Sequence, residues 1–136
     1  MLLDMETLFS DAQAVTASAA STNVIHTAAG KLKEISFGQP MPLLVQVVED
    51  FATCTSVKVG VQTATDEAFT SPVTLAETAA VAVADLKAGF KFPINFMPKG
   101  NLGYTRLYYT VAGSNATAGK ITAGFVAAHD NSFQDM

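Results

Sequence analysis

The sequence contains no tryptophan, one cysteine and only two histidines among its 136 residues. A lone cysteine, Cys54, excludes an internal disulfide, and its setting between threonines is more typical of a small, half-buried thiol than of a nucleophile. His26 and His129 lie far apart, and neither has a further ligand residue at metal-site spacing. Because zinc needs three or four ligands, we expect no metal and no other cofactor.

Basic residues are also few, with eight Lys and Arg against twelve Asp and Glu and a net charge of −4. Nucleic acid is not an expected partner, because neutralising phosphates requires clustered Lys and Arg. No stretch approaches the roughly 18 consecutive apolar residues of a membrane helix, which excludes the membrane as a partner. Asp4 and Glu6 replace the basic start of a signal peptide. The sequence therefore predicts a soluble protein made in a cytoplasm.

Catalytic motifs are missing as well. The adjacent acids Glu49–Asp50 and Asp66–Glu67 fall at strand ends and turns, and neighbours on a strand point to opposite faces, which makes them poor acid–base partners. The chain has neither the Asp-x-Asp-x-Asp-Gly pattern of a calcium loop nor a glycine-rich phosphate loop. We therefore expect a protein that is not an enzyme.

What the sequence does contain is a series of short strand patterns. In VKVGVQT (57–63) apolar and polar residues alternate, and LLVQVVE (43–49) is rich in β-branched residues. Similar patterns predict strands at 73–78, near 80–83, at 90–96, 104–111 and 120–127, with a further one possible at 24–30. Short turns and the lack of a long helical pattern together favour one domain, an antiparallel β-sandwich.

Two segments allow finer predictions. In FKFPINF (90–96) the alternating residues Phe90, Phe92, Ile94 and Phe96 should share one face, and the internal proline, which cannot donate a ladder hydrogen bond, indicates an edge strand. The polar segment before Pro72 should be a loop, with room for one helical turn and with Phe69 as its apolar anchor.

The strongest strand pattern, YTRLYYTV (104–111), has two different faces. One face suits a core and carries Thr105, Leu107, Tyr109 and Val111. The opposite face carries Tyr104, Arg106 and Tyr108, and Tyr and Arg are enriched at protein interfaces. That face is either an interface between copies of the chain or a solvated surface on which the tyrosines lie against their neighbours.

Four motifs occur in order along about residues 3 to 127: FSDAQA (9–14), FTSPVTL (69–75), YTRLYY (104–109) and TAGK (117–120). With them the chain resembles the capsid cement, or decoration, proteins of short-tailed bacteriophages, of the type found in the Bordetella phage capsid. The resemblance implies a jelly-roll-like β fold and a non-enzymatic homo-oligomer, a dimer, on the outside of a virion. It implies that the major capsid protein is the partner, with neighbouring copies clamped together.

The resemblance also suggests a role for SDAQAVTASAAST (10–22), which has small side chains and no apolar stripe. We predict an extended N-terminal arm over residues 1–23, a sandwich domain over 24–128 and a polar tail over 129–136. The expected capsid contacts of the arm are Leu8 and Phe9 as apolar anchors and Asp11 and Gln13 as polar ones.

Two alternatives remain open from the sequence. The first 23 residues can equally provide an ordinary first strand of the same sandwich. A carbohydrate- or receptor-binding module is the alternative function, since β-sandwiches often carry such sites. The lack of tryptophan and of calcium ligands counts against that function.

Overall fold

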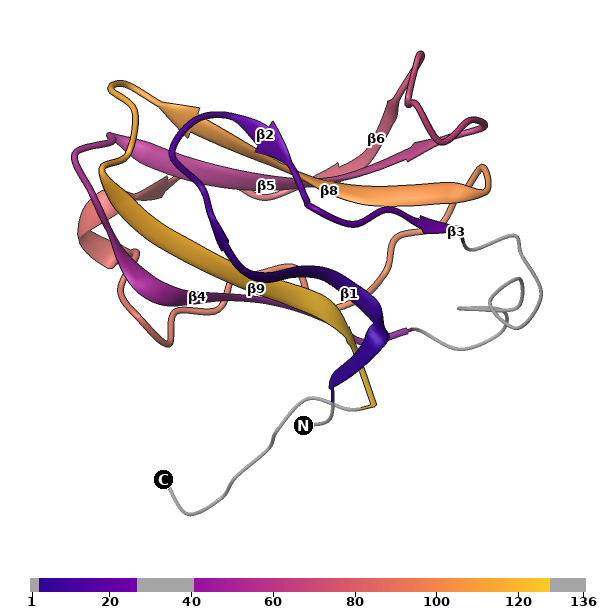
Figure 1. Cartoon of the computed structure of the whole chain (residues 1–136), viewed down its shortest axis with the longest axis horizontal. Coiled ribbons are helices and arrows are strands. Elements are labelled where there is room, and N and C mark those ends of the chain that lie inside the picture. Colours follow the sequence, from indigo (N-terminus) through magenta and orange to yellow (C-terminus); the bar gives the residue numbers. More distant parts are fainter. Residues whose placement is uncertain (1–2, 27–40, 128–136) are drawn as a thin grey trace.

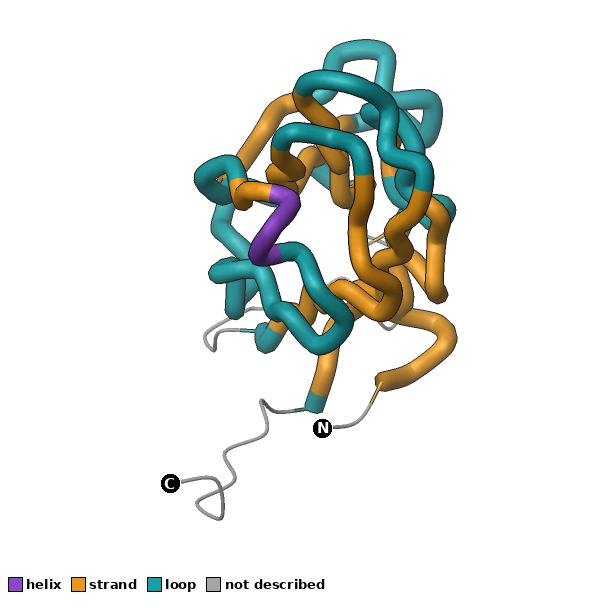
Figure 2. Tube along the Cα trace, turned by 90° about the vertical axis from the view of Figure 1, so that its left-hand side faces the viewer, coloured by secondary structure: helices purple, strands orange, loops and turns teal. Residues whose placement is uncertain are grey.

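The computed structural model describes residues 3–26 and 41–127, which form two packed layers of strands (Figure 1). The strands are β1 (Leu3–Ala14), β2 (Ala19–Ala20), β3 (Ile25–His26), β4 (Leu43–Ala52), β5 (Ser56–Ala64), β6 (Val73–Glu77), β7 (Val81–Ala82), β8 (Tyr104–Ala112) and β9 (Ala118–Val126). One 3₁₀ turn, η2 (Val83–Asp85), follows β7. Figure 2 looks at the end of the sandwich where this turn and several loops lie.

The layers are a three-stranded sheet in the order β1-β9-β4 and a six-stranded sheet in the order β2-β8-β5-β6. In the larger sheet β3 also pairs with β8, and β7 with β5. Every described strand pair is antiparallel. The predicted antiparallel β-sandwich is therefore confirmed.

The core lies between the sheets and is built from the alternating apolar positions. Val57, Val59 and Val61 of β5 are fully buried, as are Leu107 and Tyr109 of β8. The facing sheet supplies buried apolar side chains from β1, β4 and β9. Each fully buried side chain of this size contributes about 1.5–3 kcal/mol, so the period-two pattern of the sequence accounts for how the layers adhere.

The N-terminal segment is extended, but it is part of the sandwich and not a separate arm. β1 pairs with β9 through Leu8↔Gly124 and Ser10↔Ala123. Phe9 is 0% exposed, and its ring meets that of Phe125 edge-on at 5.3 Å between centroids. The predicted boundary at residue 23 therefore separates no structural units. The alternative of an ordinary first strand of the sandwich is therefore correct for β1. The buried ring of Phe9 holds this strand in the core, which its small side chains could not do.

The segment 90–96 lies along the outer edge of β4, but the predicted edge strand does not form, because isolated bridges and single backbone hydrogen bonds join the two. Phe92 and Ile94 are buried, whereas Phe96 is 50% exposed, so the prediction of one shared inward face is wrong for Phe96. Alternation holds across the tight turn at the proline, where the Ile94 amide donates to the Phe92 carbonyl at 2.8 Å. It breaks after Ile94, where Phe96 is bridged to Pro42, and Met97 takes the inward position instead.

Other predictions have mixed outcomes. The loop before β6 contains no helical turn, but Phe69 is buried there as expected. The segment from residue 80 forms a short strand and then a turn, as expected. Within the possible strand at 24–30 the structure describes Ile25–His26 as β3. The remainder of that segment and the predicted tail at 129–136 lie outside the described residues.

Candidate interaction surface

The outward side of the six-stranded sheet carries the three predicted interface residues. In the β5–β8 register Tyr104 lies opposite Ala64, Arg106 opposite Gln62, and Tyr108 opposite a glycine. All three side chains are half-buried, while their neighbours along β8 are buried in the core. Strand alternation therefore places the three on one outward face, as the sequence predicts.

Arg106 is held in place by three neighbours on this face. Its Nε donates to Gln62 Oε1 at 2.9 Å. Its guanidinium carbon lies 4.2 Å from the centroid of the Phe69 ring and 5.9 Å from that of Tyr108. Partial desolvation lowers the pKa of Arg106, although a guanidinium stays charged in proteins. The planar cation is thus fixed against aromatic rings, where cation–π attraction favours it.

Phe69 reaches Arg106 from a strained turn. It is 5% exposed and lies outside the main core cluster, and its φ is +53°, in the left-handed region that costs a non-glycine residue about 1–3 kcal/mol. Its amide donates to the Asp66 carbonyl at 3.2 Å. The Asp66 carboxylate accepts from the Thr70 hydroxyl at 2.8 Å and from its amide, which lowers the pKa of Asp66. These bonds hold the Phe69 ring beneath the guanidinium.

A second stack continues the surface toward β3. His26 lies opposite Tyr104 in the β3–β8 register, and the two rings stack at 4.1 Å with 6° between their planes. Sequence reasoning assigned no interface role to His26, Gln62 or Phe69, because the three come from segments far from β8 in the chain. We call this surface the arginine face; it consists of His26, Gln62, Phe69, Tyr104, Arg106 and Tyr108.

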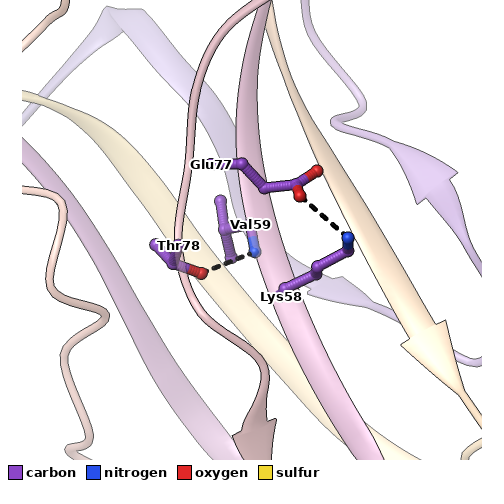
Figure 3. Close-up of polar contacts among 4 residues, drawn as sticks. All are labelled: Lys58, Val59, Glu77 and Thr78. Atoms are coloured by element: carbon purple, nitrogen blue, oxygen red, sulfur yellow. Dashed lines mark hydrogen bonds and ion pairs between the residues drawn. The ribbon is translucent and has the colours of Figure 1, made fainter.

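An ion pair borders the arginine face on the side of β6. Lys58 Nζ and Glu77 Oε1 lie 2.8 Å apart, and both side chains are partly exposed (Figure 3). Beside them the Val59 amide donates to the Thr78 hydroxyl at 3.0 Å, and the Thr78 amide donates to the Val59 carbonyl. Exposed pairs of this kind contribute about 0–1 kcal/mol to stability. The consequence for the arginine face is that the Glu77 carboxylate is already paired with Lys58.

The predicted arm contacts have three different environments. Phe9 is buried in the core and cannot touch a capsid, so its assignment as a capsid anchor is corrected. Leu8 is half-buried beside Gly124, where a side chain at the glycine would crowd it. Asp11 is exposed on β1 and remains accessible to a partner.

Gln13 instead links the two sheets within the molecule. Its Nε2 donates to the Ala20 carbonyl at 3.0 Å, and its Oε1 accepts from the Thr22 amide at 2.8 Å. The same oxygen accepts from Ser10 Oγ at 2.6 Å, and Ser10 Oγ lies 2.7 Å from the buried Tyr109 hydroxyl. Gln13 therefore closes a polar network inside the sandwich, which explains its half-buried position.

A row of apolar residues crosses one end of the three-stranded sheet on its outward side. Leu3 lies opposite Val126, the Val126 amide donates to the Pro42 carbonyl at 3.1 Å, and Pro42 is bridged to Phe96. Leu3 is 40% and Phe96 50% exposed, whereas Val126 is 3% exposed, so Leu3 and Phe96 provide the accessible area. We call these four residues the apolar row. Their assignment to one face follows from the register. The next pair along β4 and β9, Leu43 and Phe125, points into the core, so the pair before it points outward.

Comparison with known proteins bears directly on these surfaces. A family model described as Bbp16 matches residues 9–125, a span that includes most of both sheets. The chain belongs to the Bbp16 family. The name of the family indicates a Bordetella phage protein, in agreement with the resemblance found in the sequence. No curated protein matches the chain.

The described part of this Bbp16-family chain also bears on metal binding, membrane spanning and thiol reactivity. Among residues 3–26 and 41–127, no three His, Cys, Asp or Glu side chains gather in a way that could hold a metal ion. In the same ranges no helix has the length and apolar character to cross a membrane. Cys54 is buried, and burial raises the pKa of its thiol, which disfavours the reactive thiolate.

Proposed function

We propose that this Bbp16-family protein is a structural component of a phage head, that it binds the outside of the head, and that it reinforces contacts between major capsid proteins. The observation that carries the proposal is the family match over residues 9–125, on a chain that folds as a compact sandwich. We further propose that the protein self-associates as a homodimer through the arginine face.

The placement of the two surfaces supports this role. The arginine face lies on the six-stranded sheet, and the apolar row lies on the three-stranded sheet, so the two face away from each other across the core. A protein that reinforces an assembly must hold more than one neighbour at once. Two copies joined through one surface present the other twice, and linked sites raise the overall affinity through effective concentration.

Attachment to the head is assigned to the outward side of the three-stranded sheet. Phe96 and Leu3 provide exposed apolar area there, and Asp11 of the edge strand β1 provides an accessible carboxylate. Burying the exposed half of a phenylalanine is worth about 1–1.5 kcal/mol. Repeated in each copy of a dimer, such a contact gives firm attachment from individually weak sites.

The experiment is rebinding to phage heads from which the protein has been stripped. The unchanged protein should restore full occupancy, whereas Phe96→Ser should bind roughly tenfold more weakly at each site. Val73→Ser is the matched control, because Val73 is 46% exposed but lies on β6 of the other sheet. Its occupancy should equal that of the unchanged protein.

Failure of the unchanged protein to occupy stripped heads would refute the structural role. Binding to a glycan array without any affinity for heads would favour the carbohydrate- or receptor-binding alternative. Equal losses for Phe96→Ser and Val73→Ser would keep the role but move the attachment surface away from the apolar row.

A further inference from the structure

Arg106 is the only arginine in the sequence, and its charge is unmatched within the described chain. The ion pairs of the described residues join lysines to Glu77, Asp50 and Glu49. The Nε of Arg106 is bound to Gln62, but the terminal nitrogens of the guanidinium have no acceptor among residues 3–26 and 41–127. The arginine face thus presents an oriented cation without its anion.

A carboxylate is the group that fits this cation. The terminal nitrogens of a guanidinium form a planar fork that matches two carboxylate oxygens. Stacking on Phe69 and the bond to Gln62 already restrict the Arg106 side chain, so less rotamer entropy remains to be lost on binding. The strained backbone at Phe69 is a further sign of a functional arrangement, since such strain persists where surrounding contacts enforce it.

Three acidic residues border the arginine face, and two of them are engaged. Asp66 accepts both hydrogen bonds from Thr70, and Glu77 is paired with Lys58. Glu67 is exposed at the second position of the turn whose fourth residue is Phe69. Within the described chain Glu67 takes part in no ion pair, so it is the carboxylate available next to the face.

We propose, building on the self-association proposed above, that Arg106 of one copy binds Glu67 of a second copy and that the reverse pair completes a two-fold interface. In a symmetric dimer every contact between two different residues occurs twice, so one cation and one nearby anion per copy satisfy each other. The net charge of −4 makes two copies repel, and the two reciprocal pairs offset that repulsion at the point of contact.

Charge reversal tests the pair directly. Arg106→Glu or Glu67→Arg alone places two like-charged pairs in the dimer and should weaken self-association at least about tenfold in sedimentation equilibrium. An equimolar mixture of the two variants should dimerise again to within about threefold of the unchanged protein, because both of its pairs are then opposite in charge. Asp85→Arg is the control for Glu67→Arg, since it makes the same change of net charge on the exposed turn after β7, away from the face. It should leave self-association unchanged.

Thermal melting shows that each variant is folded, and recovery on mixing cannot come from a misfolded variant. The proposed pair of Arg106 and Glu67 is refuted if the mixture stays monomeric. It is also refuted if the unchanged protein is itself monomeric at micromolar concentration. Loss of head binding by Arg106→Glu when the unchanged protein is a monomer would also overturn it and would assign the face to the capsid. Rebinding of the unchanged protein to stripped heads, measured separately, shows whether the proposed function fails, since the heads can be occupied whether or not Arg106 pairs with Glu67.

Discussion

Replacing Phe9 with alanine tests whether β1 belongs to the core. The ring is 0% exposed and packs edge-on against Phe125 of β9, the strand with which β1 pairs. Phe→Ala changes at such sites cost about 3–5 kcal/mol, from lost burial and from the cavity left behind. Domains of this size are stable by about 5–15 kcal/mol, so a large share of the stability would be lost. The melting temperature should fall by roughly 10–20 °C.

The assay is urea unfolding followed by circular dichroism, with thermal melting as a second probe. Met5→Ala is the matched control, because Met5 lies on the same strand and is 83% exposed, and its unfolding free energy should change by less than about 0.5 kcal/mol. If Phe9→Ala changes the unfolding free energy as little as Met5→Ala does, the N-terminal segment is detached in solution and its assignment to the core is refuted.

Three further predictions concern buried groups. Burial raises the pKa of Tyr109, so the tyrosine of the unfolded chain loses its proton at a lower pH than that of the folded chain. The unfolding free energy should therefore fall above about pH 10. Urea titrations from about pH 8 to 11 should show this fall, and Tyr109→Phe should abolish it. Cys54 should react with a thiol reagent about a hundredfold more slowly in buffer than in urea, and equal rates would contradict its burial. Gly119→Ala should lose more than about 2 kcal/mol in thermal melts, because φ is +137° and a Cβ would run into the Phe51 ring. Gly89→Ala, at φ +96° but in open space, should lose less.

The strands with clear alternation could be predicted from the sequence. In β5 and β8 the inward positions are apolar or aromatic except for the buried threonines Thr63 and Thr105, so the pattern alone indicates the buried face, including that of Tyr109. Alternation failed at Phe96, because isolated bridges join this segment to β4 in place of a regular ladder, which residue types do not reveal. It also failed for β1, whose register shifts break the period and leave Phe9 as an isolated signal among small residues.

The arginine face could be predicted only in part. Tyr104, Arg106 and Tyr108 share a face because they alternate along one strand, which is local information. The rings that complete the surface come from β3 and from the loop before β6, and His26 meets Tyr104 through a pairing that the sequence does not specify. The contact between Phe69 and Arg106 depends on a left-handed turn residue, which is uncommon outside glycine and has no reliable sequence pattern.

The order β1-β9-β4 has a consequence for biosynthesis. β9 is the central strand of its sheet and spans residues 118–126. Until it has left the ribosome, β1 has no neighbour in that sheet and β4 has only the irregular segment 90–96 at its outer edge. The apolar faces of the earlier strands of this sheet therefore stay uncovered until β9 is available. Pairings between segments so distant in the chain form slowly, typically in milliseconds to seconds. During translation, chaperone binding and aggregation compete with closure of this sheet, and a ribosome stalled before residue 118 should carry a chain that proteases readily cut.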